Sequence, residues 1–212
     1  MNNRLIIIGA SGHGKVIADI ALCLKKYDSI AFLDDNNSSS EVMGIPVMGK
    51  TGDFLSYVET SDIIVAIGNA GIRRQWVEKL HAHNICVPVL THPHSVIGTN
   101  VILGAGTVVM AGAVINPDAV IGEGCIINTC ASVDHDCVLE NYVHVAVGAH
   151  LAGGVFVKEN TWIGAGAVIK NNIHINKECM IGAGAVVVKD IDCGGVYVGV
   201  PAKPLYGEKN MR

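Results

Sequence analysis

The sequence predicts a mixed fold in two parts, a small α/β domain followed by a parallel β-helix of about five coils. Before residue 90, short apolar runs typical of strands alternate with helix-like stretches, which is the pattern of a small parallel sheet. From Ile97 to Val187, every sixth residue is Ile, Leu or Val, with no insertion. Half of the 212 residues are hydrophobic but only 5% are aromatic, so small and branched aliphatic side chains must build the core.

The first part contains five segments with clear local patterns. We expect strands at residues 4–9, 30–33 and 63–68, and helices at 15–26 and around 70–83. This order predicts a Rossmann-like α/β domain over residues 1–90. The β-helix is then expected over residues 91–192, and a C-terminal cap or tail over 193–212.

The turn GASGHG, residues 9–14, joins the first strand to the first helix. Backbone amides at such a helix start can hold a phosphate. The spacing is GxxGxG, whereas the dinucleotide fingerprint is GxGxxG, so the motif indicates a nucleotide or nucleotide-sugar, with a tight structural turn as the alternative. Asp34 and Asp35 end the second strand, where they suit contacts to ribose, base or sugar hydroxyls, or form a solvated strand end.

The six-residue period has a direct physical interpretation. The residues at i and at i+4 both point inward, and the i+4 residues are all small or β-branched. Inward residues two apart belong to a strand, so the three residues between i and i+4 must turn a corner. At i+1, nine of the sixteen residues are Gly, Asn or Asp, which predicts positive φ there. Three hexads make one coil of a prism about 25 Å tall.

The stretch SVDHDC, residues 132–137, places three polar residues on one corner. Val133 and Cys137 are inward positions, so Asp134, His135 and Asp136 lie outside the core. Packing does not explain a histidine at that place. A neighbouring carboxylate can fix the ring tautomer and raise its basicity, as a general base requires. A solvated corner without catalytic function is the alternative.

Three further histidines, His144, His150 and His174, occupy outward i+5 positions. Residues six apart lie on different faces of the prism, so His144 and His150 do not converge within one chain. A metal site would have to form between subunits, and no metal is expected. Outward apolar residues such as Val108, Ile126 and Val147 instead predict self-association that covers them.

Charge and cysteine usage narrow the class of partner. The net charge is −4 and no run of Lys or Arg marks a nucleic-acid surface. No stretch approaches the roughly 18 apolar residues of a membrane span, so we expect no membrane partner and a cytoplasmic location. The seven cysteines form no CxxC pair, and their odd number suits a reducing compartment.

Several motifs together carry a family resemblance. GASGHG, FLDD, AIGN, the hexad array, NTCASVDHDC, YVHVAVGAHLAGGV and GVPAK follow one another in this order. In this the chain resembles the bacterial nucleotide-sugar N-acetyltransferases, which acetylate a UDP-4-amino-sugar with acetyl-CoA, as in the bacillosamine pathway. The same family includes sialic-acid O-acetyltransferase-like members. The resemblance implies left-handed coils and a homotrimer whose coenzyme sites lie between adjacent prisms.

The resemblance also assigns roles to individual residues. It implies that His135 is the general base and that Asp136 increases its basicity. The implied acetyl-CoA contacts are His144 at the thioester end, the Gly153 backbone N–H at the thioester carbonyl, and the backbone of Ala165 and Ala183 along the pantetheine arm. The implied nucleotide-sugar pocket consists of Ser11, Gly12, His13, Asp34, Asp35 and Gly68.

Two other classes of protein compete with this interpretation. Zinc carbonic-anhydrase-like proteins share the prism and use three histidines across a subunit boundary, but that class leaves the GASGHG domain unexplained. A non-catalytic nucleotide-sugar-binding scaffold leaves His135 without a role. Within the acetyltransferases, these residues do not separate N-transfer from O-transfer.

Overall fold

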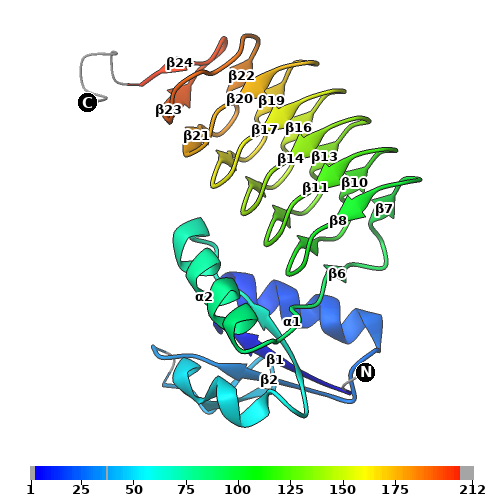
Figure 1. Cartoon of the computed structure of the whole chain (residues 1–212), viewed down its shortest axis with the longest axis vertical. Helices are drawn as coiled ribbons and strands as arrows, with labels where there is room; N and C mark the ends of the chain where they lie inside the picture. Colours follow the sequence, from blue (N-terminus) through cyan, green and yellow to red (C-terminus); the bar gives the residue numbers. More distant parts are fainter. Residues whose placement is uncertain (1–2, 37, 206–212) are drawn as a thin grey trace. The chain divides into compact units, whose positions relative to one another are not determined.

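The chain forms two compact units that meet in sequence between Pro93 and His94. The computed structural model describes residues 3–36 and 38–205, and Figure 1 shows the course of the chain. The expected boundary at residues 90–91 lies close to this division. The end of the expected tail, residues 206–212, lies outside the described residues.

The first unit is an α/β domain built on a five-stranded sheet of order β3-β4-β2-β1-β5. All pairings are parallel except that of β3 with β4. The strands are β1 (Arg4–Ile8), β2 (Ser29–Leu33), β3 (Glu41–Val42), β4 (Ile45–Gly49) and β5 (Asp62–Val65). The helices are α1 (Gly12–Leu24), α2 (Ala70–Ala82) and the 3₁₀ helix η1 (Thr51–Tyr57), and β6 (Leu90–Thr91) ends the unit. Residues 5–8 of the inner strand β1 are fully buried, as a strand covered on both faces requires.

The second unit is a left-handed parallel β-helix with three faces. The first face contains β7 (Val96–Ile97), β10 (Val114–Ile115), β13 (Ser132–Val133), β16 (His150–Leu151), β19 (Val168–Ile169) and β22 (Val186–Val187). The second contains β8 (Ile102–Leu103), β11 (Val120–Ile121), β14 (Val138–Leu139), β17 (Phe156–Val157) and β20 (His174–Ile175). The third contains β9 (Val108–Val109), β12 (Ile126–Ile127), β15 (His144–Val145), β18 (Trp162–Ile163), β21 (Cys179–Ile181), β23 (Gly195–Val198) and β24 (Lys203–Pro204). Ser132 pairs with Val114 and His150, so one coil is three hexads, as predicted.

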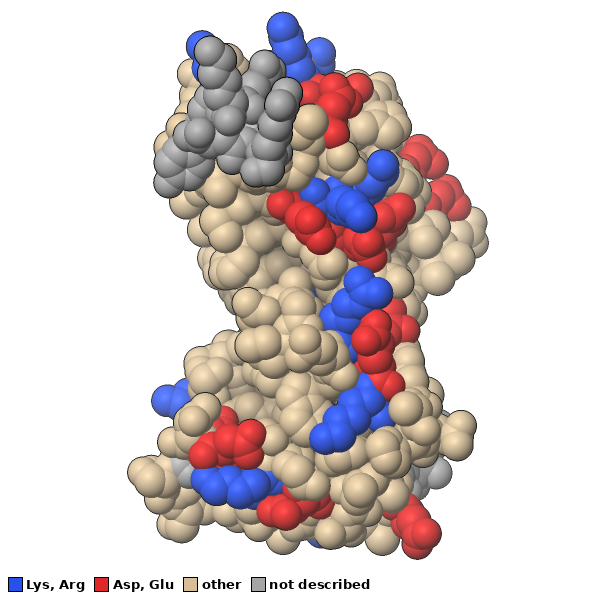
Figure 2. All heavy atoms as spheres, turned by 60° about the vertical axis from the view of Figure 1, so that its left-hand side comes forward, with Lys and Arg blue, Asp and Glu red and all other residues tan. Residues whose placement is uncertain are grey.

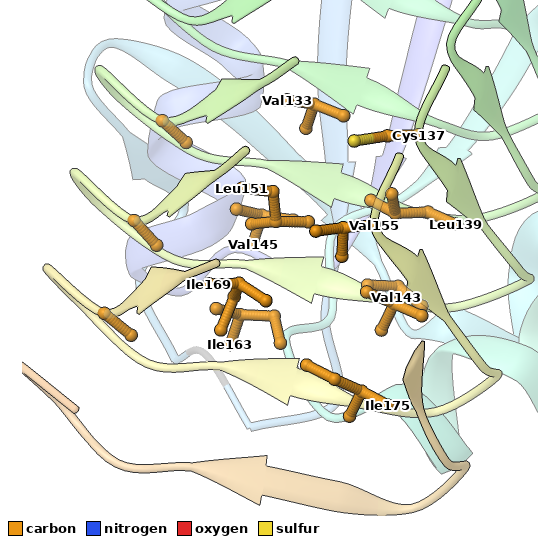
Figure 3. Packing of buried hydrophobic residues seen from close by; sticks show 14 of the residues in the cluster. Val133, Cys137, Leu139, Val143, Val145, Leu151, Val155, Ile163, Ile169 and Ile175 are labelled. Atoms are coloured by element: carbon orange, nitrogen blue, oxygen red, sulfur yellow. The ribbon is translucent and has the colours of Figure 1, made fainter. Parts of the chain in front are cut away.

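The inward positions form the core of the prism. Figure 3 shows Val133, Leu139 and Val145 projecting inward from successive strands beside Cys137 and Val143. These residues are at most 1% exposed. The inward cysteines are buried thiols rather than nucleophiles, because burial raises the pKa of Cys137 and raises that of Cys179 to about 11.

The position of the left-handed backbone within each hexad corrects one prediction. Positive φ occurs at i+3, from Asn100 through Gly184, and not at i+1. Small residues at i+1 have other causes. A methyl group on Gly104 would lie 2.5 Å from the backbone nitrogen of Glu123 in the next coil. Asp134 and Asn128, in contrast, accept the N–H of the following residue.

The exposed surface carries mixed charge. Figure 2 shows Lys and Arg side chains interspersed with Asp and Glu on the face that it displays. At the C-terminal end, Lys203 is exposed on β24, after a turn that contains Gly199 at φ 93°. None of the helices in residues 3–36 and 38–205 is long and apolar enough to cross a bilayer.

Candidate active site

The corner between β13 and β14 holds His135 in a defined position. Oδ1 of Asp134 accepts the His135 backbone N–H at 2.8 Å and Nδ2 of Asn116, in the coil below, at 2.7 Å. Asp136 adopts the left-handed conformation at φ 59°, which Asp tolerates better than most residues. The corner is therefore fixed by its own hydrogen bonds, and the His135 side chain projects from it with 61% of its surface exposed.

The His135 ring is paired with the carboxylate that follows it. Nδ1 of His135 lies 2.7 Å from Oδ2 of Asp136. A carboxylate only accepts, so Nδ1 carries the proton and Nε2 of the neutral ring is left with its lone pair. The hydrogen bond to Asp136, followed by the negative charge of Asp134, raises the pKa of His135. The pair thus has the tautomer and the raised basicity of a general base.

Gly153 occupies the same corner one coil later and faces the His135 ring. A methyl group on Gly153 would lie 2.6 Å from both Nε2 and Cε1 of His135. A side chain there would require the ring to move, so the glycine permits the observed ring position. Among the described residues, nothing accepts the backbone N–H of Gly153. The ring edge that carries Nε2 therefore lies against a residue whose backbone amide is an open donor.

The open N–H of Gly153 follows from its position in the hexad. At i+2 the N–H points away from the coil, and an Asp or Asn at i+1 can accept it, as Asp134 does for His135 and Asn176 for Lys177. Ala152 has no such acceptor. Ala165 and Ala183 also occupy i+2 positions after a glycine, and no acceptor meets their N–H groups within the described residues. All three expected backbone contacts thus share one structural position.

A groove of about 470 Å³ lies on the third face and its corner toward the first face. The rings of Trp162 and His144 stack at 4.7 Å and 23°, and Nδ2 of Asn128 lies 3.2 Å from Nε2 of His144. The groove is lined by Asn128, His144, Ala146, Val147, Trp162, Gly164, Ala165, Met180, Ile181, Gly182 and Ala183. Three of the expected acetyl-CoA contacts, His144, Ala165 and Ala183, therefore share one largely apolar groove.

Within one chain, the structure does not bring His135 and this groove together. His135 and Gly153 lie on the corners that lead from the first face to the second, whereas the groove lies on the third face. His144, His150 and His174 lie on the third, first and second faces respectively, as the period predicted. His150 is paired with Ser132, whose Oγ lies 2.8 Å from Nδ1 of the imidazole.

In the α/β unit, the expected nucleotide-sugar residues surround the start of α1. Ser11 is the N-cap of α1, and its side chain makes no capping hydrogen bond. Gly12 and Gly68 both have open space where a Cβ would stand, so packing within the chain does not require glycine at either position. Both glycines leave room for a ligand near amide donors.

The two expected aspartates are already engaged by the protein. Oδ2 of Asp34 accepts the Ala10 N–H at 2.7 Å and so shapes the turn before α1. Asp35 accepts the backbone N–H of Thr51 at 3.0 Å and its hydroxyl at 2.6 Å, and these hydrogen bonds lower the pKa of Asp35. Contacts to a nucleotide can use only the remaining lone pairs of these carboxylates.

A buried cation that sequence reasoning missed lies beneath this turn. Arg73 on α2 is 1% exposed and donates to the carbonyl oxygens of Ile67 and Gly68. Burial, followed by the positive charge of Arg73, lowers the pKa of His13 to about 4, so His13 is neutral at pH 7. Its Nε2 is buried, and no residue that the structure describes bonds to it. The helical pattern gave no sign that Arg73 points inward.

Two families of known proteins match separate parts of the chain. Residues 4–80 match the PglD N-terminal domain, and residues 154–189 match the bacterial transferase hexapeptide family of six repeats. GDP-perosamine N-acetyltransferase of Escherichia coli O157:H7 is 31% identical over 165 residues, which cover 74% of each chain. The chain belongs to the nucleotide-sugar N-acetyltransferases. This membership makes it an acetyl-CoA-dependent N-acetyltransferase and decides between N-transfer and O-transfer, which the residues had left open.

Two further relatives of this N-acetyltransferase extend the comparison. UDP-N-acetylbacillosamine N-acetyltransferase of Bacillus subtilis (strain 168) is 35% identical over 117 residues, 51% of each chain. The acetyltransferase domain of PglB from Neisseria gonorrhoeae FA1090, solved with acetyl coenzyme A, is 44% identical with a TM-score of 0.94, and the match covers 97% of this chain and 100% of that one.

Proposed function

We propose that this enzyme acetylates the amino group of a nucleotide-linked 4-amino-4,6-dideoxy sugar, with His135 as the general base. The observation that carries the proposal is the juxtaposition of His135 and Gly153. Nε2 of His135 keeps its lone pair because Nδ1 donates to Asp136, and this edge of the ring lies against Gly153, whose backbone N–H is an open donor among the described residues. Amine acetylation requires both a base and an oxyanion donor.

The chemistry follows from these two groups. As the sugar amine nitrogen attacks the thioester carbonyl carbon, its proton passes to Nε2 of His135. The carbonyl electrons move to oxygen, and the N–H of Gly153 donates to this oxyanion. When the tetrahedral intermediate collapses, the C–S bond breaks and the imidazolium returns a proton to the coenzyme A thiolate. No covalent acyl-enzyme is needed.

The donor site is built from two copies of the chain in this proposal. One copy supplies His135 and Gly153, and a neighbour supplies the groove with His144, because these groups lie on different corners of one prism. Exposed apolar side chains at the groove support such packing, since Val147 is 51% and Trp162 41% exposed. A homotrimer satisfies this geometry at three equivalent interfaces. Val108 and Ile126, which were expected to be covered by a partner, are each 1% exposed within one chain and give this packing no support.

The identity of the nucleotide that carries the sugar is also a proposal. We infer a UDP-linked substrate, and the relative from Bacillus subtilis, whose name specifies a UDP-linked sugar, supports this choice. A GDP-linked sugar is the second candidate, because the relative from Escherichia coli acts on GDP-perosamine. Gly12, Gly68 and the start of α1 accommodate a diphosphate in either case.

An acetyl-transfer assay with matched substrates tests this function. Coenzyme A thiol release is measured with UDP-, GDP- and dTDP-linked 4-amino-4,6-dideoxy sugars, and with free and CMP-linked sialic acid. Mass spectrometry of the product gives the position of the acetyl group. We expect the highest kcat/KM with a UDP-sugar and acetylation at nitrogen. A higher kcat/KM with the GDP-sugar would mean that the substrate is GDP-linked. Turnover of sialic acid alone would refute the proposal.

A further inference from the structure

A group of three possible metal ligands lies in the α/β unit. Asp19 and Cys23 are four residues apart on α1, and His92 directly follows β6. One carboxylate oxygen, the Sγ and one imidazole nitrogen all lie within 4.8 Å of one another. Across residues 3–36 and 38–205, this is the one group of three or more such side chains that meets this distance.

The fold explains why these residues meet. Residues four apart on a helix share one face, so α1 presents Asp19 and Cys23 together. β6 packs against α1, and Leu90 of β6 is 1% exposed, which anchors the chain just before His92. The group was missed in the sequence because Cys23 and His92 are far apart there.

The donor set selects a particular class of metal. A thiolate, an imidazole and a carboxylate are all ligands of Zn²⁺, whereas Mg²⁺ and Ca²⁺ take oxygen ligands. Tetrahedral zinc with bonds of about 2.0–2.3 Å places its donors roughly 3.3–3.8 Å apart. Asp19 and Cys23 are exposed and His92 is half-buried, so these side chains have room to rotate toward this spacing.

We propose that Asp19, Cys23 and His92 form a Zn²⁺ site, with water as the fourth ligand. The bound ion would link α1 to the segment that follows β6 and so stabilise the α/β unit. This site uses none of the residues proposed for acetyl transfer.

Cobalt binding to the full chain tests the proposal. Metal-free protein is titrated with Co²⁺ alone, and thiolate-to-cobalt charge-transfer absorption is recorded. We expect saturation at one Co²⁺ per chain and loss of the absorption when Zn²⁺ is added. Cys23→Ser should abolish the charge-transfer band, and His92→Gln and Asp19→Asn should each weaken binding at least tenfold. The matched control is Cys86→Ser, which removes another exposed cysteine of the same unit and should leave the band unchanged.

Alkylation provides a second measurement that does not depend on variants. Zn²⁺ should slow the reaction of Cys23 with iodoacetamide at least tenfold, as followed by peptide mass spectrometry, while Cys86 reacts at its original rate. A missing cobalt band, a band that survives Cys23→Ser, or equal protection of both cysteines would overturn the proposal.

Discussion

Two stacked corners of the β-helix, residues 134–137 and residues 152–155, occupy the same position in the repeat but present different chemical groups. In the first, Asp134 accepts the N–H of His135, so the backbone donor is satisfied and the imidazole is the group that projects outward. In the second, Ala152 has no side-chain acceptor and Gly153 has no side chain, so the Gly153 backbone N–H is the available donor among the described residues. The repeat thus fixes the backbone, and the residues at i+1 and i+2 decide which chemical group reaches the outside.

The same comparison explains the groove on the third face. Ala165 and Ala183 follow Gly164 and Gly182, and neither glycine can accept their N–H groups. A pantetheine arm carries amide carbonyls that need donors at intervals along its length. In the proposed function, the backbone N–H groups of Ala165 and Ala183, one coil apart, donate to such carbonyls without any side-chain contribution.

Removing the His135 side chain should have the largest effect on turnover. We expect His135→Ala to lower kcat by about 10²–10⁴-fold, because the base acts on a proton that moves only in the transition state. The affinities for acetyl-CoA and for the nucleotide sugar should stay nearly unchanged. Steady-state kinetics and calorimetry measure the two effects, and His174→Ala, at an exposed histidine of the second face, is the control. A variant that keeps more than about a tenth of wild-type turnover would make the corner a solvated turn.

Adding a side chain at Gly153 should have the second largest effect on turnover. Gly153→Ala places a methyl group where the His135 ring lies, so the base should move by about an ångström and kcat should fall by about 10²-fold. Asn171→Ala is the matched control, because it changes the exposed i+2 residue one coil further along. The acetyl-transfer assay compares the two variants. Equal rates for both would mean that the ring has room to move without cost.

Disturbing the groove should change binding more than turnover. In His144→Ala, the stacking partner of Trp162 is lost, and aromatic stacking is worth about 0.5–1.5 kcal/mol. We therefore expect KM for acetyl-CoA to rise about 3- to 10-fold, with a smaller change in kcat. His150→Ala changes the i+5 histidine of the next face and should leave this KM unaltered. If kcat falls more than KM rises, His144 takes part in the chemistry rather than in binding.

The period of the sequence was sufficient to predict the coils, the faces and the exposed corner of His135, because inward residues must repeat with the backbone. It did not locate the positive φ values, since Asp and Asn serve at i+1 as acceptors and at i+3 as left-handed residues. It also missed the fit of Gly153 to His135 and the burial of Arg73. These depend on contacts between coils or between elements, which only the folded chain brings together.

Replacing the Asp136 carboxylate, which accepts the hydrogen bond from His135, should have the smallest effect on activity. Asp136→Asn keeps a side chain that tolerates the left-handed backbone at this position, so the corner should stay folded. The hydrogen bond that His135 donates to Asp136 is the first cause of the raised pKa of His135, so the substitution should lower that pKa. Below its pKa the ring is protonated and cannot accept a proton from the amine. The acidic limb of the pH–rate profile for kcat/KM should therefore move to lower pH in the variant. Near neutral pH, kcat should also fall, because a weaker base accepts the proton less readily. This fall should be several-fold smaller than in His135→Ala. Profiles of the wild type and the variant, measured with one sugar nucleotide, check this sign. An acidic limb that stays in place would show that a group other than His135 controls it.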